Sequence, residues 1–233
     1  MSPTPSGSSA RQIKARGSAS PKSRRPTGKP APRNRKEMLD HTRAAILQSA
    51  LDHFGREGFD GASLRDIAAD AGVNHGMIRH VFGTKEELWR QAITFLFARV
   101  SREMSDEPSA LIAQTDRERM MAYIHRYVEY CAHHPEHARM MIQQSIMGGT
   151  KLSWVSEQFI RERHNRDLPF IDRLKANGDI PQVDTIALHF IIIGGAQMIY
   201  LLAPEVQAVD GRDVFKPAAI EKHADALVKL LFR

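Results

Sequence analysis

Residues 63–88 read SLRDIAADAGVNHGMIRHVFGTKEEL, and this stretch decides the fold. A capping pair, Ser63 and Asp66, opens a short helix whose apolar residues recur at helical spacing. Gly72 then permits the left-handed backbone that ends a helix. A second short helix follows over about 74–81. Two short helices around a tight turn are typical of a helix-turn-helix that reads DNA.

The second short helix has an inner and an outer face. A turn of about 100° per residue places Ile78, Val81 and Phe82 inward. A cap at Thr84 begins the next helix and puts Lys85 in its first turn, where backbone N–H groups and a cation together can hold a phosphate. The residues left facing outward, which we expect to meet DNA, are Asn74, His75, Gly76, Met77, Arg79 and His80.

The stretch AGVNHGMIRHVFGTKEEL, preceded by RAAILQSALDHFGREGFDGASLRDIA, resembles the DNA-binding domain of the TetR family of regulators. The likeness covers residues 43–88 and extends over apolar, Gly and Lys positions, which favours it over a generic three-helix domain. Arg79 and Val81 depart from the pattern, because the family usually has Tyr at both positions. The Tyr matching Arg79 typically touches a DNA phosphate, so the resemblance implies that Arg79 makes this contact with a formal charge.

The remaining contacts are assigned on the same basis. Ser63 and Asn74 replace the commoner Thr and Ser of the family. We expect base contacts from Asn74, His75 and Met77. Phosphate contacts are expected from Ser63, Arg79, His80 and Lys85, with Arg43 and Arg65 as weaker candidates.

The N-terminal segment differs in composition from the rest. Residues 1–36 hold ten Lys or Arg and no Asp or Glu, whereas the other 197 residues hold 23 Lys or Arg and 27 Asp or Glu. The segment is rich in Ser and Pro and poor in large apolar residues, so we expect it to be disordered. It is either a basic arm that lies along DNA or a solvated extension without function. A transit peptide or twin-Arg signal is disfavoured, because no apolar stripe follows.

The rest of the chain is predicted to be all-α. We expect a disordered tail over residues 1–36, a three-helix DNA-binding domain over 37–83, and a helical effector-binding and dimerisation domain over 84–233. Apolar periodicity marks helices near 84–100, 120–131, 135–147, 152–176, 184–203 and 217–232. A polar link is expected between the last two, and a kink is expected at Pro169.

Residues 185–203 run for 19 positions without a formal charge, close to the length that spans a bilayer. His189 and Gln197 disfavour lipid exposure. The TetR resemblance instead implies that the last two helices pair with their copies in a second subunit. The residues expected near the twofold axis are Phe190, Gly194, Met198, Leu201, Leu227 and Leu231. For these reasons we expect no membrane span. A single cysteine, Cys131, permits no internal disulfide, which agrees with a cytoplasmic protein.

Candidate sites for chemistry are few. Cys131, His133, His134 and His137 form a metal-like cluster, but Pro135 puts a helix break inside it, so we expect packing roles and no metal. No catalytic set and no cofactor fingerprint stand out, so we expect no enzyme and no cofactor.

A small-molecule pocket is implied by the family resemblance. Adaptable apolar side chains of the type that lines such cavities occur in the middle helices, although core packing is the better explanation for each one taken alone. The candidates are Tyr123, Tyr127, Met140, Met141, Met147, Trp154, Phe159 and Phe170. The cationic group at 161–166 could attract an acidic ligand or simply be a solvated helix face.

Together these observations predict a homodimeric transcription regulator, a repressor that leaves a palindromic operator in double-stranded DNA when a small-molecule effector binds. Two alternatives stay open. A ligand-independent, nucleoid-type DNA binder would select no palindrome from random DNA. A helical enzyme or carrier would handle a metabolite with no effect on DNA binding.

Overall fold

The computed structural model describes residues 34–105 and 115–232, and every regular element within these ranges is helical. The predicted disordered segment therefore lies almost entirely outside the described residues. The predicted all-α class is confirmed.

The N-terminal head consists of α1 (Arg35–Gly61), α2 (Leu64–Asp70) and α3 (His75–Phe82). Gly58 interrupts the helical backbone of α1 with a φ of 74°, and a Cβ at this position would meet Gln143 Nε2 at 2.7 Å. The left-handed region and this close approach both favour glycine, so Gly58 ends the first regular stretch of α1.

The helix α4 (Lys85–Glu103) links the head to the rest of the chain, and Thr84 caps its start by accepting from the backbone N–H of Glu87 at 3.1 Å. The body that follows is built from α6 (Asp116–His133), α7 (Pro135–Met147), α8 (Gly149–Val155), the π-helical turn η1 (Ser156–Ile160), α9 (Arg161–Ala176), α10 (Thr185–Leu201), α11 (Ala203–Asp210) and α12 (Pro217–Leu231).

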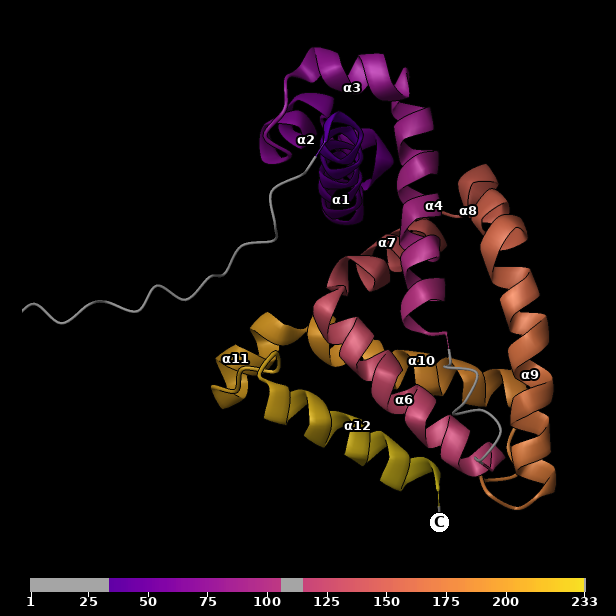
Figure 1. Ribbon diagram of the computed structural model, residues 1–233. Coiled ribbons are helices and arrows are strands. Elements are labelled where there is room, and N and C mark those ends of the chain that lie inside the picture. Colours follow the sequence, from indigo (N-terminus) through magenta and orange to yellow (C-terminus); the bar gives the residue numbers. More distant parts are fainter. Residues whose placement is uncertain (1–33, 106–114, 233) are drawn as a thin grey trace, which may run out of the picture.

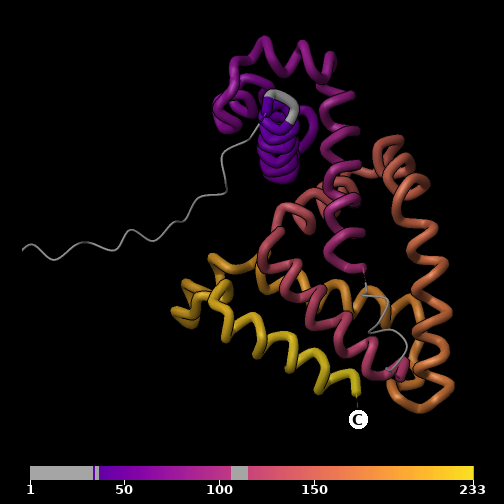
Figure 2. The backbone as a smooth tube through the Cα atoms, viewed as in Figure 1, coloured from indigo at the N-terminus to yellow at the C-terminus, as the bar shows by residue number. Residues whose placement is uncertain are grey.

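The elements form two connected parts, with α1–α3 at the top of Figure 1 and the long α4 descending from them. The tube in Figure 2 follows the chain from this head into the lower layer, where α6 packs against α10 and α12. Helix α1 packs against both α4 and α7, and Gly55 allows a close approach to Arg139 of α7. The head is therefore fixed to the rest of the protein by the packing of α1 against α4 and α7.

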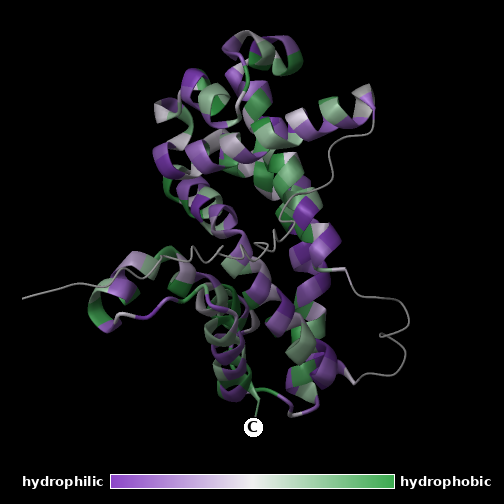
Figure 3. Ribbon diagram, turned by 60° about the vertical axis from the view of Figure 1, so that its left-hand side comes forward, coloured by the Kyte–Doolittle hydropathy of each residue, from purple (hydrophilic) through white to green (hydrophobic). Residues whose placement is uncertain are grey.

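Apolar and polar residues alternate around most helices in Figure 3, as expected for elements that bury one face. The buried apolar residues belong to a core cluster that includes Phe54 of α1, Trp89 of α4 and Val128 of α6. No single helix among the described residues is long and apolar enough to cross a membrane. The pair α10 and α11 passes such a test only jointly, and it is bent by 65°.

One prediction about the elements is wrong, and another needs refinement. The span 152–176 is helical throughout, as predicted, but the π-helical turn η1 lies between α8 and α9. Pro169 lies inside α9. The expected polar link after α10 is instead the helix α11, with Pro204 in its first turn, where the missing N–H of proline costs no hydrogen bond.

Candidate nucleic-acid interface and ligand cavity

The helix α3 is fixed by two inward side chains. Ile78 and Phe82, one turn apart, are buried. Their burial leaves the opposite side of α3 free, and Met77 there is 40% exposed. Gly76, Arg79 and His80 are exposed as well, so the predicted outer face of this helix faces solvent.

Val81 corrects the predicted facing of α3. Its side chain is 38% exposed, although the periodicity placed it inward. Ile78 and Phe82 are the buried residues of α3, and Val81 lies beside them. It therefore joins Met77 as an apolar group available on the outer surface, a type of group that can contact thymine methyls.

Two of the expected DNA contacts also cap helices. The Ser63 hydroxyl accepts from the backbone N–H of Arg65 at 3.2 Å, and the side-chain Oδ1 of Asn74 accepts from the backbone N–H of Gly76 at 2.7 Å. These caps satisfy N–H groups that a helix start leaves without partners. The Asn74 amide nitrogen remains available to donate to an acceptor outside the protein.

The cationic candidates fall into two groups. Arg65, Arg79 and His80 are exposed and form no hydrogen bond or ion pair through their side chains with any residue in the described ranges. Arg43 instead donates to Gln91 and lies over the Phe82 ring at 5.1 Å. Lys85 donates to the Asp60 carbonyl at 3.1 Å and lies over the Phe59 ring at 5.1 Å. Arg43 and Lys85 therefore also stabilise the head itself.

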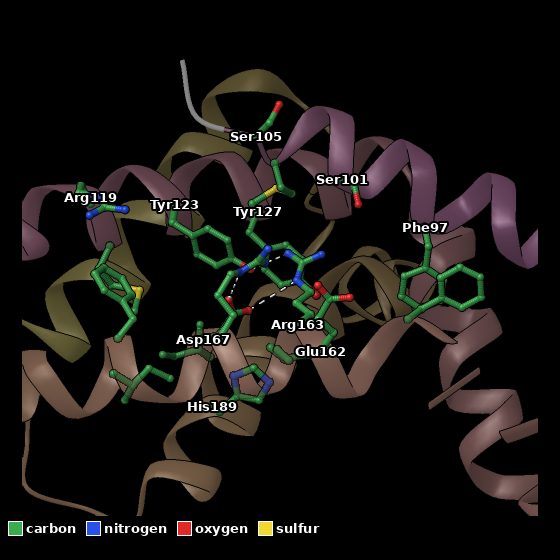
Figure 4. Close-up of a pocket in the computed structure, with 18 of the residues that line it drawn as sticks. Phe97, Ser101, Ser105, Arg119, Tyr123, Tyr127, Glu162, Arg163, Asp167 and His189 are labelled. Atoms are coloured by element: carbon green, nitrogen blue, oxygen red, sulfur yellow. Dashed lines mark hydrogen bonds and ion pairs between the residues drawn. The ribbon is translucent and has the colours of Figure 1, made fainter. Parts of the chain in front are cut away.

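A cavity of about 760 Å³ lies in the body, between α4, α6, η1, α9 and α10. Four of the eight pocket candidates line it, namely Tyr123, Tyr127, Phe159 and Phe170. The wall also contains residues that were not among the candidates, notably Phe97, Ser101, Arg119, Asp167 and His189 (Figure 4). The apolar Phe97 was missed because it lies on α4, whereas the pocket candidates were sought in the middle helices.

The other four pocket candidates lie elsewhere. Met140 is fully buried in the core, Met141 is half-buried against it, and Met147 is 66% exposed near the end of α7. Trp154 packs against Trp89 with ring centroids 5.5 Å apart and against Phe159 at 5.6 Å. It therefore stands behind the cavity wall. Residue type alone could not separate these roles, because cavity lining and core use the same side chains.

The centre of the cavity is an arginine held by polar neighbours. Arg163 Nη2 donates to the Tyr123 hydroxyl at 3.0 Å, and Arg163 Nε lies 3.6 Å from Asp167 Oδ2. Burial opposes the charged guanidinium, but Tyr123 and Asp167 outweigh it and raise the pKa of Arg163. Burial also raises the pKa of Tyr123, so its hydroxyl stays neutral. Beside them, Gln197 of α10 donates to the Tyr127 hydroxyl at 2.6 Å.

One side of α10 carries an apolar stripe that is exposed to solvent. Phe190 is 61% exposed, Ile191 and Met198 are exposed, and Gly194 and Leu201 are partly exposed. Leu227 and Leu231 do not belong to this surface, because both are buried within the same subunit. They lie on the face of α12 that packs against α6 and α10, and Leu227 sits where Gly195 lacks a side chain. Both therefore pack within one subunit, and their place near a twofold axis stays a prediction.

The metal-like cluster is divided among separate environments. His137 is buried and its Nδ1 lies 2.9 Å from the Tyr130 hydroxyl, whereas His133 is exposed. His134 contacts Glu103 at 3.2 Å. Burial raises the pKa of the Cys131 thiol to about 12, and a protonated thiol is a poor metal ligand.

Two known protein families match most of the chain. Residues 46–92 match the family described as bacterial regulatory proteins, tetR family, and residues 102–233 match the family described as YcdC-like protein, C-terminal region. The second match alone covers more than half of the chain. The chain belongs to the TetR family. This membership indicates a transcriptional regulator.

Individual TetR relatives agree with this assignment. RutR of Escherichia coli K12 is 27% identical over 182 residues, which are 76% of this chain and 82% of RutR. An HTH-type transcriptional repressor of Mycobacterium tuberculosis is 38% identical over 90 residues, which are 38% of this chain and 48% of the relative. The chain thus spans about half the length of the mycobacterial relatives that it matches.

A solved TetR-like structure shares the fold. AibR, whose structure is a complex with isovaleryl coenzyme A and operator DNA, aligns with a TM-score of 0.61 at 18% identity, over 82% of this chain and 98% of AibR. An HlyIIR mutant aligns with the same TM-score and identity over 83% of this chain and 98% of that chain.

This TetR chain joins its head to its body through a buried ion pair that sequence reasoning missed. Arg99 of α4 and Glu136 of α7 are 6% and 4% exposed, and their closest atoms are 2.6 Å apart. Gln48 of α1 accepts from Arg99 at 2.7 Å and donates to Glu136 at 3.1 Å. Three helices thus meet at one polar cluster. Its sequence signal is an arginine between the buried Leu96 and Val100 of α4.

Proposed function

We propose that this protein is a homodimeric repressor that releases a palindromic operator when a small-molecule effector occupies the cavity. One observation carries the proposal. The same helix, α4, starts directly after the reading helix α3 and ends at the cavity wall, where Phe97 and Ser101 line it. A change at the cavity can therefore tilt the reading helix without any change in the fold.

The outer face of α3 supports the DNA-binding part of the proposal. It presents Asn74, His75 and Met77 for base edges, and Arg79 with His80 for phosphates. Arg65 and Arg79 are cations without an internal partner among the described residues. Such cations neutralise phosphates and release counterions, which makes affinity depend on salt concentration.

The cavity acts through α4 as a lever. With 19 residues and a rise of about 1.5 Å each, α4 is about 28 Å long. The Arg99–Glu136–Gln48 cluster ties it to α1 and α7 near the cavity end. An effector that fits only the tilted arrangement shifts the population toward dimers whose reading helices no longer match successive major grooves, roughly 34–36 Å apart.

The exposed stripe of α10 supports the dimeric part of the proposal. Large apolar side chains such as Phe190 and Ile191 gain free energy when a second copy covers them. Gly194 lies within the stripe and lets two helices approach closely. A symmetric pairing of two such faces presents α3 twice, which is what a palindromic site requires.

Replacing Arg79 with Gln tests the role assigned to the reading helix. We expect weaker binding to every duplex by a similar factor, and a slope of log affinity against log salt that is shallower by about 1 per subunit, because one phosphate contact is lost. Met77→Ala should instead change which base pairs are preferred. The measurement is fluorescence anisotropy with one selected and one unrelated duplex over a series of KCl concentrations.

The matched control is Arg102→Gln, which removes the same charge from an exposed side chain at the opposite end of α4. It should leave both affinity and salt slope unchanged. If Arg79→Gln altered sequence preference, or if Arg102→Gln flattened the slope equally, the assignment of Arg79 to phosphate would be wrong.

A further inference from the structure

The cavity has more cationic than anionic groups. Four arginines line it, at positions 119, 163, 166 and 173, against the two carboxylates of Glu162 and Asp167. Asp116, behind the wall, pairs with Arg173 at 3.0 Å and with Arg119 at 3.6 Å. Counting this third carboxylate, four cations face three anions, so one positive charge is left over.

The surplus charge lies among arginines of the wall that make few hydrogen bonds within the described part of the protein. Asp167 is already shared, because it lies 3.6 Å from Arg163 and 3.2 Å from Arg166. Of the Arg163 nitrogens, only Nη2 has a hydrogen-bond acceptor among the described residues, namely Tyr123. The Nε of Arg119 is buried and has no hydrogen-bond partner in the described part of the chain. Guanidinium donors without acceptors are suited to bind an oxyanion.

The neutral polar groups beside Arg163 add donors. Tyr123 accepts from Arg163, so its own proton can be donated to a ligand. His189 also lines the cavity, and burial, together with His164 and Arg163, lowers its pKa. A neutral imidazole offers one N–H donor and adds no second positive charge.

The apolar part of the cavity has a defined shape. Phe97 and Phe159 stack with ring centroids 4.6 Å apart and planes within 4°. In Figure 4, Phe97 lies at the opposite end of the cavity from Arg119, and the pair Tyr123 and Arg163 lies between them. Aromatic rings favour contact with flat apolar groups.

From this arrangement we infer that the effector is an organic monoanion, whose acidic group binds at Arg163 and Tyr123 and whose flat apolar body lies toward Phe97 and Phe159. A polyanion would exceed the single surplus charge. An uncharged ligand would leave Arg163 and Arg166 to share the single carboxylate of Asp167 in a partly buried site. The inference rests on the proposed function, because the cavity is an effector site only if that proposal holds.

Two dyes of the same shape test the inference. 1-Anilinonaphthalene-8-sulfonate is a flat monoanion, and N-phenyl-1-naphthylamine has the same ring system without the sulfonate. Titrated by fluorescence into the full chain without DNA, the sulfonate should bind at least about tenfold more tightly than the neutral dye. Higher salt should reduce this preference. Equal or tighter binding of the neutral dye would overturn the inference.

Variants locate the preference within the cavity. Arg163→Gln should reduce the preference for the sulfonate to about twofold or less, and Arg163→Lys should keep most of it. Arg161→Gln removes an exposed charge from the same helix outside the cavity wall and should leave the preference unchanged. Circular dichroism melting checks that each variant folds. If Arg163→Gln does not fold, Arg119→Gln replaces it and should lower the preference at least threefold.

The outcomes separate this inference from the proposed function. A preference for the sulfonate that is undiminished in folded Arg163→Gln or Arg119→Gln contradicts the assigned anion site, and binding of the dyes to the exposed α10 stripe would give that result. DNA release is not measured in this experiment. The inference can therefore fail although DNA release occurs, and it can hold although DNA release does not occur.

Discussion

Glu136→Gln is expected to lower the free energy of unfolding by about 3 kcal/mol, because it leaves the Arg99 guanidinium buried without its counter-charge. Arg99 is 6% exposed, and its Nη2 lies 2.6 Å from the carboxylate. The carboxylate is firmly ionised. Burial alone would raise the pKa of Glu136. Contacts with His134, Arg99 and Gln48 outweigh burial and lower this pKa to about 2. Urea unfolding at pH 7.5 and equal protein concentration measures the change.

Two further variants define what the loss means. Glu103→Gln removes an exposed carboxylate of α4 that also contacts His134, and we expect it to change stability by no more than about 0.5 kcal/mol. The double variant Arg99→Met, Glu136→Leu should recover most of the loss, because apolar side chains of similar size need no counter-charge. A Glu136→Gln protein as stable as the wild type would show that this pair does not hold α4 to α7.

Because of His137, we expect the protein to lose stability at pH values well above those at which carboxylates titrate. Burial, together with Arg163 and Arg99, lowers the pKa of His137 to about 3, and Glu136 only partly opposes this. The unfolded chain binds this proton near pH 6.5. Stability is therefore complete above about pH 6.5 and falls by about 1.4 kcal/mol per pH unit down to about pH 3. At pH 5 the expected loss from His137 is about 2 kcal/mol.

Comparison of variants isolates this contribution. His137→Gln should remove most of the pH dependence of unfolding between pH 6.5 and 5, and His133→Gln, at an exposed position, should leave it intact. Glu136 does not interfere, because a pKa lowered to about 2 makes its own contribution fall away only below about pH 4.5. His189, whose pKa is also lowered, adds slope in both variants equally. An unchanged pH slope in His137→Gln would contradict the assignment.

The head was largely predictable from the sequence, because its signals are local. Ser63, Asn74 and Thr84 cap their helices as side-chain acceptors, and Gly58 takes the left-handed backbone. Ile78 and Phe82 follow the helical period into the core. Val81 was misplaced because it lies at the edge of a narrow contact, and only the neighbouring helices determine which edge residues are covered.

The cavity and the dimer face were less predictable, because both depend on which helices pack together. Met140 and Tyr127 are both buried, yet only Tyr127 also lines the cavity. Leu227 fits an interface by type, but Gly195 draws it into its own subunit. The Arg99–Glu136 pair joins residues 37 positions apart, a separation that no local pattern reveals.

Selection of bound fragments from a pool of random duplexes tests the central claim, that two paired subunits present α3 to successive major grooves. The wild type should return an inverted repeat whose half-sites are centred about 10 base pairs, or a multiple of this, apart. Ile146→Glu alters an exposed isoleucine away from the α10 stripe and should return the same repeat, whereas Phe190→Glu should return single half-sites or no sequence. A wild-type pool without any inverted repeat, or a full repeat selected by monomeric Phe190→Glu protein, would contradict the account.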